Sequence, residues 1–399
     1  MRATGGVRAG WRSSARRRNG IGRLLGAGAV LAMVAGLSAC SSSNGTASGP
    51  AHSQGNPVLA DANVLTLQSS QSYTPTAPAG GGTDDYHCTL VDPHVTSDST
   101  IVASQFFPQS PEVHHAILFL VPPTLAAKAK ADDANGQGWT CFGESPLPGT
   151  SFFEVGNTPW LTAWAPGHGL DVTPAGTGVP FPAGSLVIMQ IHYNMLVGDK
   201  PVRSKLVLDT VPSATHHLQT LQMDLLPAPP DLPCPVGVTG PLCDRSASLA
   251  DLGQRFGQDQ VKFVNFLEGF CGHTPPTNAG ANSTSCSWTI PAGHIVRLTA
   301  HMHLLGAGMT VVLNNGTTQK TLLDVTNYNF DYQRSYNLAK PVTTTDGNTL
   351  TVTCTYNPTL RQRLPQLRQL PARYVTWGDG SSDEMCLAIV QYIGPKPVI

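Results

Sequence analysis

The chain has 399 residues, 40 of them glycine and 33 proline, and its formal net charge is −1. Residues 1–39 hold seven arginines and no acidic residue, so residues 40–399 carry 17 Lys and Arg against 25 Asp and Glu, a net charge of −8. An acidic protein is a poor candidate for binding nucleic acid, because that affinity depends on cationic contacts to phosphate. We therefore expect no nucleic-acid partner.

Residues 1–39 have the layout of a secretory signal. An arginine-rich start precedes an apolar run from Leu24 to Leu37, which is too short to indicate a membrane span. The ending Leu37-Ser38-Ala39-Cys40 resembles the bacterial lipobox, which implies cleavage before Cys40 and lipid on its sulfur. An ordinary signal peptide followed by a chance cysteine is the alternative. The lipobox predicts an extracytoplasmic lipoprotein, on the periplasmic or cell-surface side, that meets a bacterial membrane only through its anchor.

The next segment, residues 40–82, is rich in Ser, Gly, Pro, Ala and Thr and predicts a flexible tether. About 315 residues remain, enough for one large domain or two ordinary ones. Residues 246–266 predict a short helix, and short β-rich runs broken by Gly and Pro predominate elsewhere. Such runs favour sandwiches or jelly rolls. The clearest runs are Thr100–Phe106, Ala116–Val121, Leu186–Tyr193, Ile295–His303, Met309–Leu313, Leu350–Tyr356 and Met385–Ile393.

Eight cysteines follow Cys40. An even number of cysteines in an exported chain predicts disulfides. Thiolate metal ligands are the alternative, and the absence of any CxxC pair from the sequence disfavours them. The eight are Cys88, Cys141, Cys234, Cys243, Cys271, Cys286, Cys354 and Cys386.

The first two groups of histidines lie on predicted strands. His114 and His115 are neighbours, and neighbours on a regular strand point to opposite faces. Both can reach one metal ion only if the strand starts, ends or bulges there. His192 shares a strand face with Gln190. Taken alone, each of these histidines fits an ordinary strand position as well as a ligand.

The third group is His301 and His303. Their i, i+2 spacing puts both imidazoles on one strand face, which suits chelation of a single ion. Arg297 and Thr299 share that face, and the alternate residues are apolar, so we expect a cleft side and a core side. An HxH pair is also found in cupins and zinc enzymes, so it does not identify the metal by itself.

Six stretches resemble the copper type II, ascorbate-dependent monooxygenases, a family that includes peptidylglycine alpha-hydroxylating monooxygenase and dopamine beta-monooxygenase. The stretches occur in the family's order and cover roughly residues 84 to 393. They are Asp85–Cys88, Val113–His115, Ala163–Gly167, Gln190–Tyr193, His301–Leu304 and Ser381–Cys386.

The resemblance implies an all-β protein with two tandem jelly-roll-like β-sandwich domains. The expected domains are residues 83–214 and 215–399, each with a copper site facing an interdomain cleft, and the second domain carries a Cys-containing insertion at about 228–285. The residues that match the ligands of the electron-transferring copper are His114, His115 and His192. Those that match the ligands of the oxygen-binding, catalytic copper are His301, His303 and Met385.

The ligand types agree with copper. Imidazole suits copper in either oxidation state, and a thioether is soft and favours Cu(I). Zinc gains little from a thioether, so Met385 disfavours a zinc hydrolase. The resemblance also implies the disulfides Cys88–Cys141 and Cys354–Cys386. For the remaining four cysteines we expect the pairs Cys234–Cys243 and Cys271–Cys286, with the other pairings left open.

The chain departs from the family where a substrate should be recognised. The positions that bind peptide substrate in the peptide-processing member hold Thr299, Leu387 and Ile389. Alternation puts Leu387 and Ile389 on the face of Met385, which predicts an apolar cleft. Arg297 is a further cleft candidate that could meet an anion, or it could be solvated or salt-bridged.

The resemblance therefore implies a monooxygenase with two coppers per chain that hydroxylates a C–H bond of an apolar or aromatic small substrate. It would use O2 and an external reductant such as ascorbate. The alternative is a non-catalytic copper-binding lipoprotein for storage, delivery or sensing. A serine or zinc hydrolase is disfavoured, because the sequence has no Gly-x-Ser-x-Gly stretch. The sequence predicts no oligomeric state.

Overall fold

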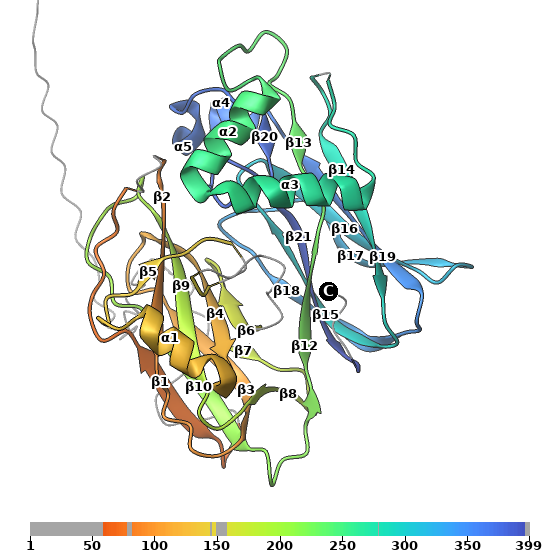
Figure 1. Ribbon diagram of the computed structural model, residues 1–399. Helices are drawn as coiled ribbons and strands as arrows, with labels where there is room; N and C mark the ends of the chain where they lie inside the picture. The colour runs from red at the N-terminus through yellow and green to blue at the C-terminus, as the bar shows by residue number, and fades with distance from the viewer. Residues whose placement is uncertain (1–58, 78–81, 144–145, 149–157, 278, 396–399) are drawn as a thin grey trace, which may run out of the picture. The chain divides into compact units, whose positions relative to one another are not determined.

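The structure is a computed structural model that describes residues 59–77, 82–143, 146–148, 158–277 and 279–395 (Figure 1). The predicted signal, Cys40 and the first part of the predicted tether lie outside the described residues. All the described residues belong to one compact unit. No helix in the described ranges is long and apolar enough to cross a membrane.

The first pair of sheets comes from the first half of the chain. One sheet has the order β1-β10-β3-β8-β11, with β7 also on β3, and the other has the order β5-β2-β9-β4-β6. Leu206 and Leu208 from the first sheet share a buried core with Leu118 and Val187 from the second. The strands are β1 (Asn63–Gln68), β2 (Asp84–Val91), β3 (Ser99–Phe107), β4 (Val113–Val121), β5 (Trp139–Thr140), β6 (Trp160–Trp164), β7 (Asp171–Val172), β8 (Thr177–Phe181), β9 (Leu186–Asn194), β10 (Lys205–Pro212) and β11 (Gln219–Thr220).

The second pair of sheets has the orders β12-β21-β15-β18 and β14-β19-β16-β17, and a small sheet pairs β13 with β20. On β14 every second residue is buried, so Cys286, Trp288 and Ile290 enter the core. The strands are β12 (Gln222–Pro227), β13 (Asp231–Leu232), β14 (Ser283–Ile290), β15 (Gly293–Met302), β16 (Gly306–Asn314), β17 (Gln319–Val325), β18 (Ser335–Thr344), β19 (Asn348–Tyr356), β20 (Val375–Thr376) and β21 (Cys386–Ile393).

The two longest helices, α2 and α3, contribute side chains such as Leu252 and Phe263 to the core of the second pair of sheets (Figure 1). Ala129 of α1 packs on the β5-β2-β9-β4-β6 sheet, and Met223 and Ile389 of the second pair reach the same apolar cluster. The two pairs of sheets therefore share apolar contacts. The helices are η1 (Pro123–Leu125), α1 (Ala126–Asp132), α2 (Arg245–Phe256), α3 (Gln258–Cys271), α4 (Leu360–Arg363) and α5 (Pro365–Arg368).

The seven predicted strand runs and the β-dominated architecture are confirmed. The helix predicted at 246–266 is two helices, because Gly257 takes φ 91° and ψ 162°, outside the helical region. All four predicted disulfides are present, namely Cys88–Cys141, Cys234–Cys243, Cys271–Cys286 and Cys354–Cys386.

The predicted extent of the tether, residues 40–82, is wrong. Within it, β1 pairs along its whole length with β10, and Tyr73 forms a bridge with Val202. Leu65 and Leu67 point toward the core, and Leu67 is buried. The polar and Gly/Pro-rich composition around this stretch conceals one short apolar alternation, which is enough for an edge strand.

Candidate metal centres

A β-bulge brings the first histidine group together. Where β4 pairs with β9, Val113 lies opposite Tyr193 and His115 lies opposite His192, so His114 is the extra residue. A bulge disrupts the strict alternation of a strand and re-aims a side chain. The ligand nitrogens of His114, His115 and His192 all lie within 4.8 Å of one another. This is the local irregularity that a shared site for two neighbouring histidines requires.

The three rings direct Nδ1 toward a common space. The Nδ1 atom of His115 is 3.3 Å from Nδ1 of His114 and 3.2 Å from Nδ1 of His192. All three side chains are buried, and burial, together with the neighbouring histidines, lowers the pKa of His114 and His115 well below the usual range. Neutral imidazole is the form that binds metal. His114 and His115 are therefore held in the form that can bind a metal ion at neutral pH.

His192 is oriented by a buried carboxylate. Its Nε2 donates to Asp84 Oδ1 (2.8 Å), and Tyr86 stacks on its ring at 4.2 Å. Burial alone would raise the pKa of Asp84, but the hydrogen bond and charge of His192 and the Ser381 hydroxyl lower it. A carboxylate behind a histidine is the usual support for a metal-binding imidazole.

The second group lies at the end of β15. His301 and His303 have ring centroids 5.4 Å apart, and Nδ1 of His301 donates to Gln333 Oε1 (2.7 Å), which leaves Nε2 free. Burial lowers the pKa of His301 to about 4 and, helped by His301, that of His303 to about 3. Within the described part of the chain, the buried Nδ1 of His303 has no hydrogen-bond partner.

Met385 is placed beside these histidines by strand pairing. It precedes β21, and β21 pairs with β15 so that Cys386 lies opposite Met302 and Leu387 lies opposite His301. Met385 and His301 line the same cavity, and Met385 is buried. The Cys354–Cys386 disulfide holds the neighbouring residue against β19. The thioether and the imidazole of His301 are thus available to one site.

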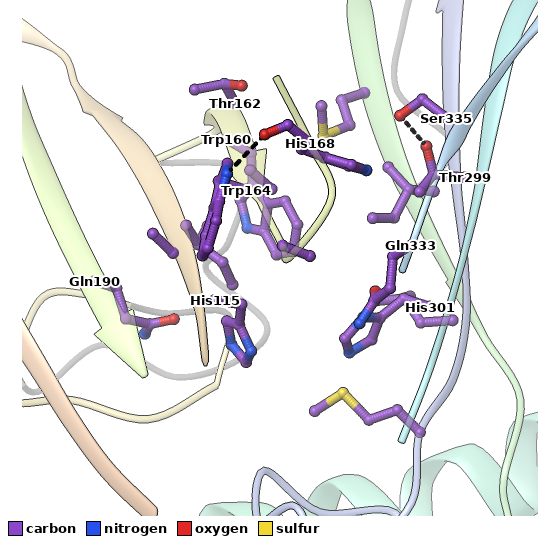
Figure 2. A pocket seen from close by; sticks show the side chains of 18 of the residues that line it. His115, Trp160, Thr162, Trp164, His168, Gln190, Thr299, His301, Gln333 and Ser335 are labelled. Carbon is purple, nitrogen blue, oxygen red and sulfur yellow. Dashed lines mark hydrogen bonds between the residues drawn. The ribbon is translucent and has the colours of Figure 1, made fainter. Parts of the chain in front are cut away.

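The two histidine groups meet at an interior cavity of about 80 Å³. Figure 2 shows His115 and His301 facing each other there, and their ring centroids are 6.0 Å apart. Aromatic walls come from Trp160 and Trp164 of β6 (Figure 2). A second, larger cavity of about 730 Å³ reaches His114 from the other side. Both histidine groups therefore border cavities, and one cavity is common to them.

Three of the four predicted cleft residues line the shared cavity, namely Thr299, Leu387 and Ile389. Arg297 is the exception. Its guanidinium donates to Asp171 Oδ1 (2.7 Å) and Val172 O (2.6 Å) of β7, so it ties the two pairs of sheets together. Of the alternatives for Arg297, the structure therefore shows the salt bridge, because the carboxylate of Asp171 lies within hydrogen-bond distance of its buried guanidinium.

Sequence reasoning missed several supporting residues. Gln333 holds His301, Asp84 holds His192, and Phe330 stacks on His114 at 4.3 Å while its centroid lies 5.9 Å from His303. No motif marks them, since each reaches its histidine only through the folding of distant segments. A polar residue next to Asp85-Tyr86-His87-Cys88 was the one available signal for Asp84.

The fold and site define an all-β protein with a buried three-histidine cluster and a second His-x-His group beside a methionine. Residues 276–398 match the family model of the copper type II ascorbate-dependent monooxygenase, C-terminal domain. The matched segment contains His301, His303 and Met385. This match supports copper-dependent monooxygenase chemistry, an oxidoreductase activity, at a general level.

The chain is similar to several solved structures, but with TM-scores well below 0.5 for the three described here. A peptide-N(4)-(N-acetyl-beta-D-glucosaminyl) asparagine amidase has a TM-score of 0.33 at 7% identity, covering 84% of this chain and 98% of that chain. An allantoicase has 0.19 at 10% identity, covering 74% and 90%. The allantoicase from Saccharomyces cerevisiae has 0.21 at 9% identity, covering 84% and 90%. Scores this low carry no argument about function.

Proposed function

We propose that this chain is a two-copper monooxygenase that hydroxylates a C–H bond of a small apolar or aromatic substrate, with O2 and an external reductant such as ascorbate. The observation that carries the proposal is that two groups of candidate ligands border one cavity, with a thioether in only one of them. The family match over residues 276–398 supports the copper chemistry.

The donor sets fit copper. Bound copper would supply one-electron redox chemistry and activation of dioxygen. We propose that His114, His115 and His192 hold the electron-transferring ion, with Asp84 fixing the ring of His192. We propose that the catalytic ion is held by His301, His303 and Met385, with Gln333 fixing the ring of His301.

The cavity supports the class of substrate. Its walls include the apolar side chains of Ile117, Trp160, Leu387 and Ile389, and no Lys or Arg is among the described residues that line it. An anionic substrate would therefore lack a partner for its charge. Burial of the site excludes bulk water, which protects an oxidising centre from side reactions.

We propose further that the two pairs of sheets are two jelly-roll-like domains and that the protein is a bacterial lipoprotein anchored through Cys40. The four disulfides support an oxidising, extracytoplasmic location. The lipobox at Leu37–Cys40 supports the anchor.

A copper store, carrier or sensor is the second candidate, because the same ligands would serve it. The shared cavity favours the enzyme, since a carrier needs no substrate site beside its metal. Oxygen uptake by copper-loaded protein with ascorbate, measured against hydroxylated product, separates the two. Uptake without product from a panel of small aromatic and aliphatic compounds would favour the carrier.

Met385→Ile tests the assignment of the catalytic site. We expect two coppers per wild-type chain by metal analysis, and we expect the variant to keep its fold and first site but lose product formation. Met309→Ile is the matched control, because Met309 is a buried core methionine that does not line the cavity. Normal hydroxylation by Met385→Ile would show that the second site is assigned wrongly.

A further inference from the structure

The loop that ends at Met385 is held by a helix from the predicted insertion. This methionine loop, residues Trp377–Met385, runs from β20 to β21 and is buried throughout. Arg255 of α2 forms two hydrogen bonds with Asp383, from Nη1 to Oδ2 (2.7 Å) and from Nη2 to Oδ1 (2.8 Å). Such a two-point contact fixes orientation as well as distance. Asp383 is two residues before Met385.

The ion pair is part of a closed network. Arg255 Nε also donates to Asp251 Oδ2 (2.8 Å) on the same helix, and Arg373 contacts both Asp251 (2.9 Å) and Asp383 (3.1 Å). From α3, Gln260 donates to Asp379 Oδ2 (2.9 Å). Two arginines and an amide therefore hold the carboxylates of the methionine loop from one side.

The backbone of the loop is fitted closely to this network. A Cβ atom added at Gly380 would lie 2.7 Å from Asp383 Oδ2 and 2.9 Å from Arg255 Nη1. One added at Gly378 would lie 2.6 Å from Leu252 Cδ1. A larger residue at either position would displace these side chains. The loop and α2 are therefore built as one packed unit.

The same loop reaches the first histidine group. The Ser381 hydroxyl donates to Asp84 Oδ1 (2.6 Å), the oxygen that accepts from His192 Nε2. Tyr86, which stacks on His192, donates its hydroxyl to the carbonyl oxygen of Asp379 (2.7 Å). A single loop thus joins Met385 to the support of His192, although these residues belong to different pairs of sheets.

We propose that α2 and the methionine loop form a brace that positions both metal centres at once. Arg255 sets the end of the loop that carries Met385, and Ser381 sets His192 through Asp84. Both are positioning residues that act through another side chain. The role of the brace in positioning copper rests on the proposed function. The structural coupling between the two histidine groups is expected in the metal-free protein as well.

Arg255→Lys tests the first half of the brace in the full-length protein. The lysine keeps the charge but loses the two-point contact with Asp383. We expect copper binding at the Met385 site to weaken at least about tenfold, with loss of the sulfur contribution in X-ray absorption spectra of the Cu(I) protein. Arg245→Lys is the matched control, because Arg245 also lies on α2 but pairs with Asp231 and Glu268.

Ser381→Ala tests the second half with a change too small to prevent folding. We expect the copper at His192 to bind about tenfold more weakly and its Cu(II) electron paramagnetic resonance spectrum to shift. Ser382→Ala is the neighbouring control and should alter neither. The brace is refuted if Arg255→Lys and Ser381→Ala keep wild-type affinities and spectra, or if the controls change equally.

Amide hydrogen exchange in metal-free protein separates this proposal from the proposed function. Arg255→Lys should accelerate exchange in residues 378–385 and in the Asp84–Tyr86 segment of β2, whereas Arg245→Lys should not. If wild-type protein binds no copper, the proposed function fails while this exchange result still decides the brace. If the protein binds copper but Arg255→Lys accelerates exchange only within α2, the brace is refuted while the proposed function stands.

Discussion

Asp379→Asn is expected to remove part of the pH dependence of the free energy of unfolding. Asp379 is buried against α3 and accepts hydrogen bonds from Gln260 and from the backbone of Gly143. Burial, together with the nearby charge of Asp383, outweighs these bonds and raises its pKa from 3.8 to about 7. Asparagine has nearly the same shape and cannot ionise, so it resembles the protonated acid. The variant therefore removes a titration with little change in packing.

The sign and size follow from linkage. At pH 3 both the folded and the unfolded chain protonate Asp379, and the carboxyl has no net effect on the free energy of unfolding. Between the ordinary pKa of 3.8 and about 7, the unfolded chain is ionised while the folded chain keeps its proton. Stability then falls by about 1.4 kcal/mol per pH unit, to an upper limit of about 4 kcal/mol. Above about pH 7 the loss is complete.

The assay is urea unfolding of metal-free wild-type and Asp379→Asn protein, with disulfides intact, at intervals from pH 4 to pH 8. Most other titrating groups contribute equally to both proteins, so their contributions cancel in the difference between the two free energies of unfolding. We expect the variant to gain relative to wild type as the pH rises, by up to about 4 kcal/mol. A difference that stays constant with pH would refute the reasoning, because the hydrogen bonds from Gln260 and Gly143 would then outweigh the cost of burying the charge.

Two further predictions concern the first site and a disulfide. His192→Ala should remove one of three imidazoles, so metal analysis should find close to one copper per chain, and stopped-flow reduction by ascorbate should slow; two tightly bound coppers would contradict the assignment. Replacing Cys271 and Cys286 by serine opens a loop of 15 residues and should lower the free energy of unfolding by about 3 kcal/mol, measured by guanidinium unfolding. A loss below about 1 kcal/mol would show that the insertion helices hold without it.

Much of the β framework could be predicted because its signal is local. Alternation on β9 or β15 depends on residues two apart, and it survives any tertiary arrangement that buries one face. The strand β1 was wrongly predicted as part of the tether because its local signal is weak. Its apolar alternation is only a few residues long, and only the partner strand β10, more than 130 residues away, makes it a strand.

The candidate metal ligands could be proposed from sequence because six ordered stretches of the chain resemble the copper type II, ascorbate-dependent monooxygenases. The spacing of the histidines alone identified neither the metal nor the full set of candidate ligands. The bulge that lets His114 and His115 share a site left no pattern that fixes it in advance, yet the shared site required it. Local propensity therefore does not explain why the strand bulges at His114.

The supporting residues were beyond sequence reasoning for a physical reason. A hydroxyl, an amide or a carboxylate behind a ligand is interchangeable with many polar side chains until the fold fixes its distance. Arg297 shows this, since alternation gave its face correctly but Asp171 of another sheet decided its partner. The same holds for Arg255, whose role depends on Asp383 being 128 residues away in sequence and 2.7 Å away in space. Variants at such positions therefore test the arrangement of the fold, whereas variants at the ligands test only the chemistry.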